Sequence, residues 1–513
     1  MKACIVTSTD TQTAAADTQP VRVVLMVVST VLFVASLGQT VVATALPTIV
    51  RDLGGLDHIT WVVTAYLLAS TVGAPIFGKL GDLFGRKIIL QCGIMIFMLG
   101  SLLSGLAGSM GVIVAGRAIQ GFGAGGLIVV VMAVIADVLP PRERGRAQGL
   151  MGAVFGISTV IGPLVGGFFV EHLNWHWIFF INLPIGIGAI LILAFALQST
   201  VRPVARKIDY AGAILLAGFL SAVVLLANTG GTTHPWSSPP MVALIAIILV
   251  CLGAFIFAES RAAEPILPLT LFRINTFVVI NSVGFMVGAT MFGTLTFLPL
   301  FLQVVKGISP TVSGMLILPM MVGLIGGSFL AGRTMTRTGR YKFLPVLSTG
   351  ILIIGMLLMS TLTAEMPLWQ VSLYMFVTGT GIGPVMSVGV AALQNAAPVS
   401  QIGVATASAN MFRLIGGSIG TSVFGALFSA ATAARLTELF PGQDTTSMAA
   451  LDAEAISALP LDMQETVLSA FSHAMHPVFL FAACLAVLAF LLSMLLKELP
   501  LSTVLQSVDR SAA

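Results

Sequence analysis

Long uninterrupted runs of apolar residues alternate with short polar stretches along most of the chain. A bilayer core of about 30 Å requires roughly 20 apolar residues per helix, and we identify fourteen runs of about this length or longer. They cover residues 21–43, 59–78, 88–108, 111–137, 145–170, 177–198, 210–229, 241–259, 275–303, 310–332, 343–363, 367–393, 403–431 and 475–497. The pattern predicts an all-α polytopic membrane protein with 14 transmembrane helices.

Composition supports this prediction. Of the 513 residues, 57% are hydrophobic and only 9% are charged, whereas a soluble domain contains about 25% charged residues. The net charge of +4 does not indicate nucleic-acid binding, because the basic residues lie in short connections. If the N-terminus is cytoplasmic, 19 of the 24 Lys and Arg residues fall on the cytoplasmic side. The positive-inside rule therefore predicts a cell-membrane protein with both termini in the cytoplasm.

Two polar connections form an internal repeat. Residues 78–87 read GKLGDLFGRK and residues 332–340 read GRTMTRTGR, each after the second apolar run of its half. The repeat predicts two parallel six-helix bundles, 21–198 and 275–497, related as the halves of many transporters are. Residues 199–274 would then be a linker with two extra helices, 432–474 an extracytoplasmic connection, and 1–20 and 498–513 cytoplasmic tails.

These features resemble the major facilitator superfamily, in its fourteen-helix drug/proton antiporter branch, over nearly all of residues 21–497. The resemblance implies a secondary active exporter of amphipathic small molecules, driven by proton antiport with alternating access. Its partners would be small-molecule substrates, protons and the lipid bilayer. It also implies no cofactor, and a monomer that works alone or with accessory export proteins.

The first repeat contains the residue types of an ionic gate. Asp82 and Arg86 lie four residues apart, where a carboxylate can cap a helix and a guanidinium can bind a carboxylate, and Asp137 is the expected partner of Arg86. The resemblance implies that this region locks the outward-facing state of the transporter; the alternative is a simple topology determinant. The expected gating residues are Asp137, at the end of run 111–137, and in the two repeats Gly78, Asp82, Gly85, Arg86, Arg333, Gly339 and Arg340.

A glycine-rich stretch, GISTVIGPLVGG at residues 156–167, resembles the motif that the family associates with antiporters. Small residues let helices approach closely, and a proline inside a helix removes a backbone donor. Helix packing alone is the alternative interpretation. The residues that match the motif, also assigned to gating, are Gly156, Gly162, Pro163, Gly166 and Gly167.

Arg117 lies inside an apolar run, in the stretch RAIQGFGAGG. A charge near the middle of the membrane costs about 2.5–3.5 kcal/mol on insertion scales, so it should face a cavity and have a partner. The resemblance implies substrate binding or proton coupling by Arg117, with Gln120 one turn away; a structural hub bonded to backbone carbonyls is the alternative. Gln39, Thr40 and Tyr66 are expected to line the same cavity. Arg413, in run 403–431, is assigned to substrate binding or the inner gate.

The first run lacks an expected acid. The branch usually reads Leu-Asp-x-Thr here, but this chain reads Leu37-Gly38-Gln39-Thr40, and no Asp or Glu lies near the middle of any run. Three interpretations remain: protons couple through Asp82, Asp137 or competition at Arg117; the substrate is anionic or polar-neutral; or coupling is lost. The alternative function is therefore a carrier or facilitator for an organic anion or a secreted metabolite.

Other classes are disfavoured. The chain contains no His-Glu-x-x-His motif, no carboxylate pair within an apolar run and no nucleotide-binding loop, which would mark a membrane enzyme or a metal site. Two repeated bundles with gate motifs also favour a carrier over a channel.

Overall fold

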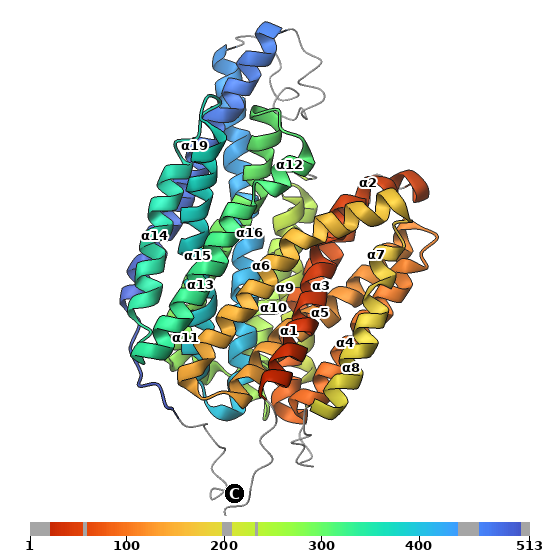
Figure 1. Cartoon of the computed structure of the whole chain (residues 1–513), viewed down its shortest axis with the longest axis vertical. Coiled ribbons are helices and arrows are strands. Elements are labelled where there is room, and N and C mark those ends of the chain that lie inside the picture. Colours follow the sequence, from red (N-terminus) through yellow and green to blue (C-terminus); the bar gives the residue numbers. More distant parts are fainter. Residues whose placement is uncertain (1–20, 55–58, 197–207, 231–233, 440–460, 504–513) are drawn as a thin grey trace, which may run out of the picture.

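The structure is a computed structural model that describes residues 21–54, 59–196, 208–230, 234–439 and 461–503. Over these ranges the chain forms helices and short connections (Figure 1). Residues 1–20 and 504–513, which belong to the predicted tails, lie outside the described residues.

The helices fall into three groups along the chain. The first group is α1 (Val21–Thr40), α2 (Val42–Leu53), α3 (Ile59–Phe84), α4 (Arg86–Gly105), α5 (Met110–Val138), α6 (Pro141–His172), α7 (Trp177–Phe180) and α8 (Asn182–Ala196). The second is the inserted pair α9 (Tyr210–Thr229) and α10 (Pro239–Arg261). The third begins after the 3-10 turn Leu269–Arg273 and contains α11 (Asn275–Leu300) with a π-helical extension Phe301–Val305, α12 (Pro310–Met315), α13 (Leu318–Thr338), α14 (Phe343–Met359), α15 (Leu368–Ala396), the 3-10 turn Val399–Gln401, α16 (Ile402–Leu439) and α19 (Leu461–Met494).

The predicted fold class is confirmed. In the described part of the chain, 13 helices are long and apolar enough to cross a membrane, and α14 is a shorter apolar helix. A helix satisfies every backbone group within its own segment, which the hydrocarbon core requires. Apolar side chains of α10, including Leu249, Val250 and Phe257, are exposed on the protein surface, as expected for a helix in contact with lipid.

The connection expected over residues 432–474 is shorter in the structure. Helix α16 continues to Leu439 and α19 begins at Leu461, so much of the expected loop is helical. Polar residues such as Glu438 and Glu465 ended the apolar runs in the sequence, but a helix can extend into water beyond the bilayer. Residues 440–460 lie outside the described part of the chain.

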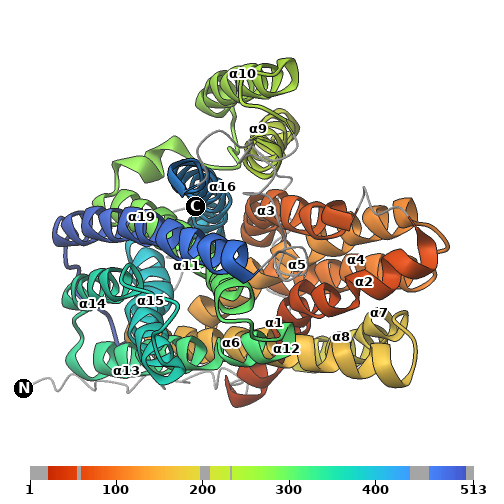
Figure 2. The same ribbon diagram turned by 90° about the horizontal axis from the view of Figure 1, so that it is seen from above.

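Helices α1–α8 form one half of the molecule and α11–α19 the other (Figure 2). The most extensive packing between the two halves is α6 against α13 and α3 against α16, and α15 also packs on α6. These pairs lie on opposite sides of the molecule, and α9 and α10 lie outside the halves on the side of α3 and α16 (Figure 2). Each pair joins the second long helix of one half to the fifth of the other.

Candidate functional site

The connection after α3 contains a buried ion-pair cluster. The guanidinium of Arg86 lies between two carboxylates: Nη2 donates to Asp82 and Nε donates to Oδ2 of Asp137 at 3.1 Å. Only 3% of the Asp82 side chain is exposed, compared with 41% of the Asp137 side chain. Gly85 joins α3 to α4 with φ 92°, a conformation that favours glycine. The contact expected between Arg86 and Asp137 is present.

Asp82 also connects the two halves. Its carboxylate oxygens accept hydrogen bonds from the backbone N–H groups of Gly403 and Val404, each at 2.9 Å. These groups begin α16, where free N–H groups and the helix dipole favour a negative charge. A Cβ at Gly78 would lie 2.8 Å from the Gly403 carbonyl oxygen, so glycine permits this close approach. We refer to this region as the α3–α16 contact.

The second repeat forms the equivalent α6–α13 contact. A Cβ at Gly332 would lie 2.3 Å from the Gly145 carbonyl oxygen. Arg142, in the first turn of α6, donates from Nε to the Thr336 carbonyl at 2.8 Å and from Nη2 to the Arg337 carbonyl at 2.9 Å. These are among the last carbonyls of α13, which have no partner within their own helix.

The other second-repeat residues assigned to gating lie either at the end of α13 or on the protein surface. Gly339 has φ 68° and ends α13 in a left-handed conformation. The Arg333 and Arg340 side chains, which the repeat assigns to gating, are exposed. Arg142, from the other half, is the arginine that contacts the end of α13.

A buried arginine at the start of α6 contacts the end of α5 and α15, and sequence reasoning missed it. Arg144 is 1% exposed and donates to the carbonyls of Leu139 at 3.1 Å, Ala136 at 2.8 Å and Gln394 at 3.3 Å. The predicted run began at residue 145, so Arg144 was assigned to a loop, whereas α6 begins at Pro141. The pair of prolines at 140 and 141, typical of a helix start, was the available signal.

The segment that follows α19 contacts this region. The backbone N–H of Arg142 donates to the Ser502 carbonyl at 3.2 Å. The Tyr341 hydroxyl donates to the Lys497 carbonyl at 2.9 Å and accepts from the Leu499 N–H at 3.0 Å. Burial raises the pKa of Tyr341, so this hydroxyl stays neutral at physiological pH. All these contacts lie at one end of the molecule, which we call the basic end because it contains Arg86, Arg142 and Arg340.

Arg117 is fully buried in the first half. Its Nη1 donates to the Gly38 carbonyl at 2.7 Å and to Gln120 Oε1 at 2.6 Å, and its Nε donates to the Val62 carbonyl at 3.2 Å. The guanidinium carbon lies 4.0 Å from the centre of the Tyr66 ring, a cation–π distance. Two of these acceptors are backbone carbonyls, the kind of contact that the structural-hub alternative expects.

The position of the missing acid lies beside this hub. A Cβ at Gly38 would lie 3.0 Å from Cζ of Phe97 and 3.5 Å from Nε2 of Gln120. Backbone carbonyls therefore serve as the acceptors for Arg117 where a span-1 carboxylate would be the obvious partner, and Phe97 occupies much of the space such a side chain would need.

The remaining first-half predictions are only partly matched. Tyr66, Arg117 and Gln120 are buried between helices and do not line the pocket described below, because their polar atoms are directed to neighbouring helices. The Thr40 hydroxyl donates to the Ser158 carbonyl of α6 at 3.2 Å, and Gln39 is half-buried. In the second half, Arg413 donates to Asn410 on its own helix and also lies outside that pocket.

The glycine-rich stretch of α6 packs against three helices, α1, α2 and α13. A Cβ at Gly162 would lie 2.1 Å from the Thr40 hydroxyl and one at Gly166 would lie 2.3 Å from the Thr44 hydroxyl, whereas Gly156 faces Ile325 of α13. Pro163 lies within the helix, and a Cβ at Gly167 would meet nothing within 4 Å. Packing thus accounts for three of the four glycines.

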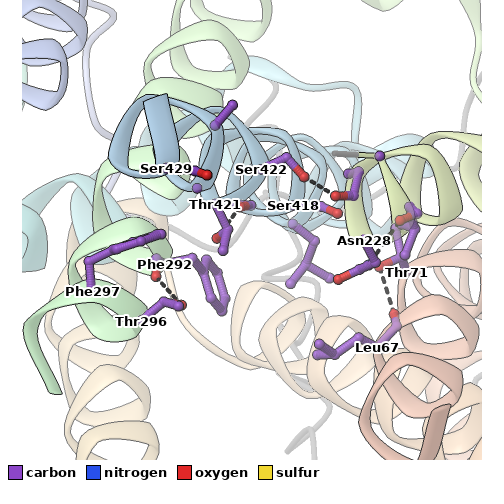
Figure 3. A pocket seen from close by; sticks show the side chains of 17 residues that line it. Leu67, Thr71, Asn228, Phe292, Thr296, Phe297, Ser418, Thr421, Ser422 and Ser429 are labelled. Carbon is purple, nitrogen blue, oxygen red and sulfur yellow. Dashed lines mark hydrogen bonds between the residues drawn. The ribbon is translucent and has the colours of Figure 1, made fainter. Parts of the chain in front are cut away.

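A pocket of about 460 Å³ opens between α3, α9, α11 and α16 (Figure 3). Phe292, Thr296 and Phe297 contribute from α11, and Leu67 and Thr71 from α3. Helix α16 supplies its wall from Leu414 to Ser429, and α9 supplies Val224, Ala227 and Asn228. The pocket therefore includes residues from both halves and from the inserted pair. Sequence analysis did not find it, because its residues are ordinary Ser, Thr and apolar side chains.

The inserted pair is also tied to the first repeat. Lys79 Nζ, on α3, donates to Glu264 Oε2 at 2.8 Å, beyond the end of α10. Nearby, Glu259 is buried and accepts from the backbone N–H groups of Ile266 and Leu267 at 3.0 and 3.1 Å. This fixes the turn that presents Glu264 to α3.

Comparison with known proteins agrees with this architecture. Residues 28–421 match the model of the Major Facilitator Superfamily. The chain is 39% identical to the multidrug transporter protein MdtP of Bacillus subtilis, over 79% of this chain and 75% of that protein. It is 34% identical to multidrug resistance protein 3 of the same organism, over 80% of each. The crystal structure of the human organic anion transporter MFSD10 aligns over 92% of this chain and 99% of that one, with a TM-score of 0.61 at 16% identity, and shows the same fold.

Proposed function

This chain belongs to the major facilitator superfamily, in its drug-efflux branch, and we propose that it exports amphipathic small molecules by proton antiport with alternating access. It is a membrane transport protein, not an enzyme. Its relatives MdtP and multidrug resistance protein 3 are named for multidrug transport or resistance. The observation that carries the proposal is a pocket lined by both halves, combined with hydrogen bonds that join those halves at the basic end.

We place the basic end in the cytoplasm of a cell-membrane protein with both termini inside, because cytoplasmic connections are enriched in Lys and Arg. On this orientation the structure is a state closed toward the cytoplasm. Transport then requires the α3–α16 and α6–α13 contacts to separate at the basic end, so that substrate can enter from the cytoplasm.

We assign the proton to Asp137. Asp82 already accepts from Arg86, Gly403 and Val404, so protonating it would disturb all three contacts. Among the described residues, Asp137 accepts a side-chain hydrogen bond from Arg86, and Arg144 is a further positive charge that interacts with it. Because 41% of the Asp137 side chain is exposed, water can reach it. Protonation of Asp137 would weaken its hold on Arg86 and thereby couple proton binding to the α3–α16 contact.

The test uses purified protein in liposomes that contain a pH-sensitive dye. Adding a transported amphiphile should move protons in wild type, and Asp137→Asn should abolish proton movement while keeping substrate counterflow. Glu143→Gln, which removes an exposed carboxylate at the start of α6, should behave as wild type. Counterflow without proton movement in wild type would instead establish the facilitator alternative, which the absence of a mid-span acid favours. Absence of any counterflow would refute export altogether.

A further inference from the structure

The pocket between α3, α9, α11 and α16 is lined without a charge. None of its 17 lining residues is Asp, Glu, Lys, Arg or His. Moving an ion out of water is expensive unless a counter-charge or a metal compensates it. A lipophilic cation would find no carboxylate here, and an anion would find no guanidinium, because Arg117 and Arg413 lie outside the lining. The pocket therefore suits an uncharged ligand.

Three threonine hydroxyls of the lining are arranged as hydrogen-bond acceptors. The hydroxyls of Thr71, Thr296 and Thr421 donate to the carbonyls of Leu67, Phe292 and Gly417, at 2.8, 2.9 and 2.8 Å. A hydroxyl has one donor and two acceptor lone pairs, so each of these groups has used its hydrogen on its own helix. What each oxygen can still offer a ligand is a lone pair (Figure 3). A ligand that bonds to them must supply N–H or O–H groups.

The apolar part of the lining determines the chemistry of the remainder of the ligand, the part that makes no hydrogen bonds. Phe292 and Phe297 of α11 and Leu67 of α3 provide aromatic and aliphatic surface. A volume of about 460 Å³ falls in the range of pockets that hold drug-sized molecules. The ligand is thus amphipathic, with an apolar body and donor groups.

Helix α9 forms one wall, although it belongs to neither half. Ala227 lines the pocket, and its carbonyl accepts a hydrogen bond from Ser422 of α16. Of the inserted pair, α9 therefore supplies the pocket wall, on the side where the pair lies outside the two halves (Figure 2).

We propose that this pocket binds uncharged amphipathic molecules that carry hydrogen-bond donors, and that the inserted helix α9 is part of the binding site. The proposal rests on the proposed export function for its biological role, but binding is measured separately from transport.

The experiment uses full-length protein in lipid nanodiscs and four dansyl probes that share one fluorophore. Dansylamide is uncharged with an N–H donor, N,N-dimethyl dansylamide is uncharged without one, dansylglycine is an anion, and a dansyl quaternary ammonium is a permanent cation. Dansylamide should bind tightest. Thr296→Val and Thr421→Val should each weaken dansylamide about fivefold, the ratio expected for one lost hydrogen bond, and leave the dimethyl probe unchanged.

The control variants distinguish the loss of a hydrogen bond from the steric filling of the pocket. Thr30→Val removes a hydroxyl with the same backbone hydrogen bond on an exposed face of α1 and should change nothing. Ala227→Leu fills the pocket from α9 and should weaken both uncharged probes, whereas Ala246→Leu, on the exposed surface of α10, should not.

Tightest binding of either charged probe would overturn the proposal, as would equal affinity in the two threonine variants and wild type, or no binding of dansylamide. If Ala227→Leu left the affinity of both uncharged probes unchanged, the result would show that α9 is not part of the binding site. Binding with the expected pattern but no counterflow in liposomes would refute export and leave this inference standing. Counterflow in liposomes, combined with threonine variants that bind dansylamide as wild type does, would support export and refute this inference about the pocket.

Discussion

In the first half a carboxylate on α3 caps the helix that arrives from the other half, whereas in the second half an arginine on the arriving helix binds the carbonyls that end α13. The two repeats keep glycines at equivalent places, Gly78 with Gly332 and Gly85 with Gly339. At the position of Asp82, however, the second repeat has Thr336, whose hydroxyl donates to the Gly332 carbonyl at 2.9 Å.

The repeat motif combines two properties, close helix approach and charge, and the two halves differ only in the second. Gly78 and Gly332 allow the helices of each contact to approach closely, and Gly85 and Gly339 adopt a positive φ where α3 and α13 end. The charges hold the contact together, and only the first half uses a buried carboxylate and guanidinium pair. The second half pairs a charge with neutral carbonyls. The α3–α16 contact should therefore be the more sensitive of the two to loss of charge.

The largest effect is expected for Asp82→Asn. The variant leaves the buried Arg86 with only the half-exposed Asp137 as counter-charge and removes an anion from the start of α16; breaking a buried pair typically costs about 3–5 kcal/mol. We expect the initial rate of dansylamide transport in liposomes to fall at least about tenfold. Thr336→Val, at the equivalent position, should retain most of the rate. Equal losses in the two variants would show that the halves do not differ as described.

A smaller effect is expected for Gly332→Ala. The added methyl would lie 2.3 Å from the Gly145 carbonyl oxygen, and overpacking of this kind costs about 1–3 kcal/mol. Both the thermal midpoint in detergent and the transport rate should fall. Gly326→Ala, on the same helix where a Cβ meets nothing within 4 Å, should match or exceed wild-type stability. A harmless Gly332→Ala would mean that the α6–α13 contact is not under close-packing constraint.

Arg142→Gln should have a moderate effect. It removes two guanidinium hydrogen bonds to α13, one of which is exposed, so we expect a loss of about threefold in transport rate. Arg146→Gln, a nearby exposed arginine, is the matched control. Hydrogen exchange at the last turn of α13 would locate the change, and unaltered exchange there would contradict the assigned contact.

The smallest effect is expected at Lys79 and Glu264. The Glu264 side chain is 34% exposed, and pairs that water can reach contribute only about 0–1 kcal/mol. Glu264→Gln should lower the transport rate less than about twofold, and high salt should erase the difference by screening. A salt-independent loss would instead indicate that the inserted pair controls the α3–α16 contact directly.

Much of the fold could be predicted because the membrane restricts the choices. Runs of about 20 apolar residues that cross a membrane must be helices, and these runs identified almost all of the long helices. The ends were less certain, since α16 and α19 extend beyond the apolar core into a segment that hydropathy does not mark. The pairing of Arg86 with Asp137 was also predictable, because a charge near the membrane needs a nearby opposite charge.

The site was predictable only where it contains charge. Asp82 and Arg86 stand out in an apolar chain, but the pocket is built from Thr, Ser and Phe residues that resemble any lipid-facing or packed helix. Arg117 shows a related limit: the sequence showed that it needs partners, but backbone carbonyls carry no sequence signature as acceptors.

The sequence by itself determined the helical membrane fold, the repeat and the first-half ion pairs, because bilayer energetics and charge act on each segment locally. Only the tertiary structure decided which partners meet across the halves. Asp82 caps α16, Arg142 binds the carbonyls at the end of α13, and α9 completes an uncharged pocket. Each of these depends on helices far apart in the sequence arriving at the same place.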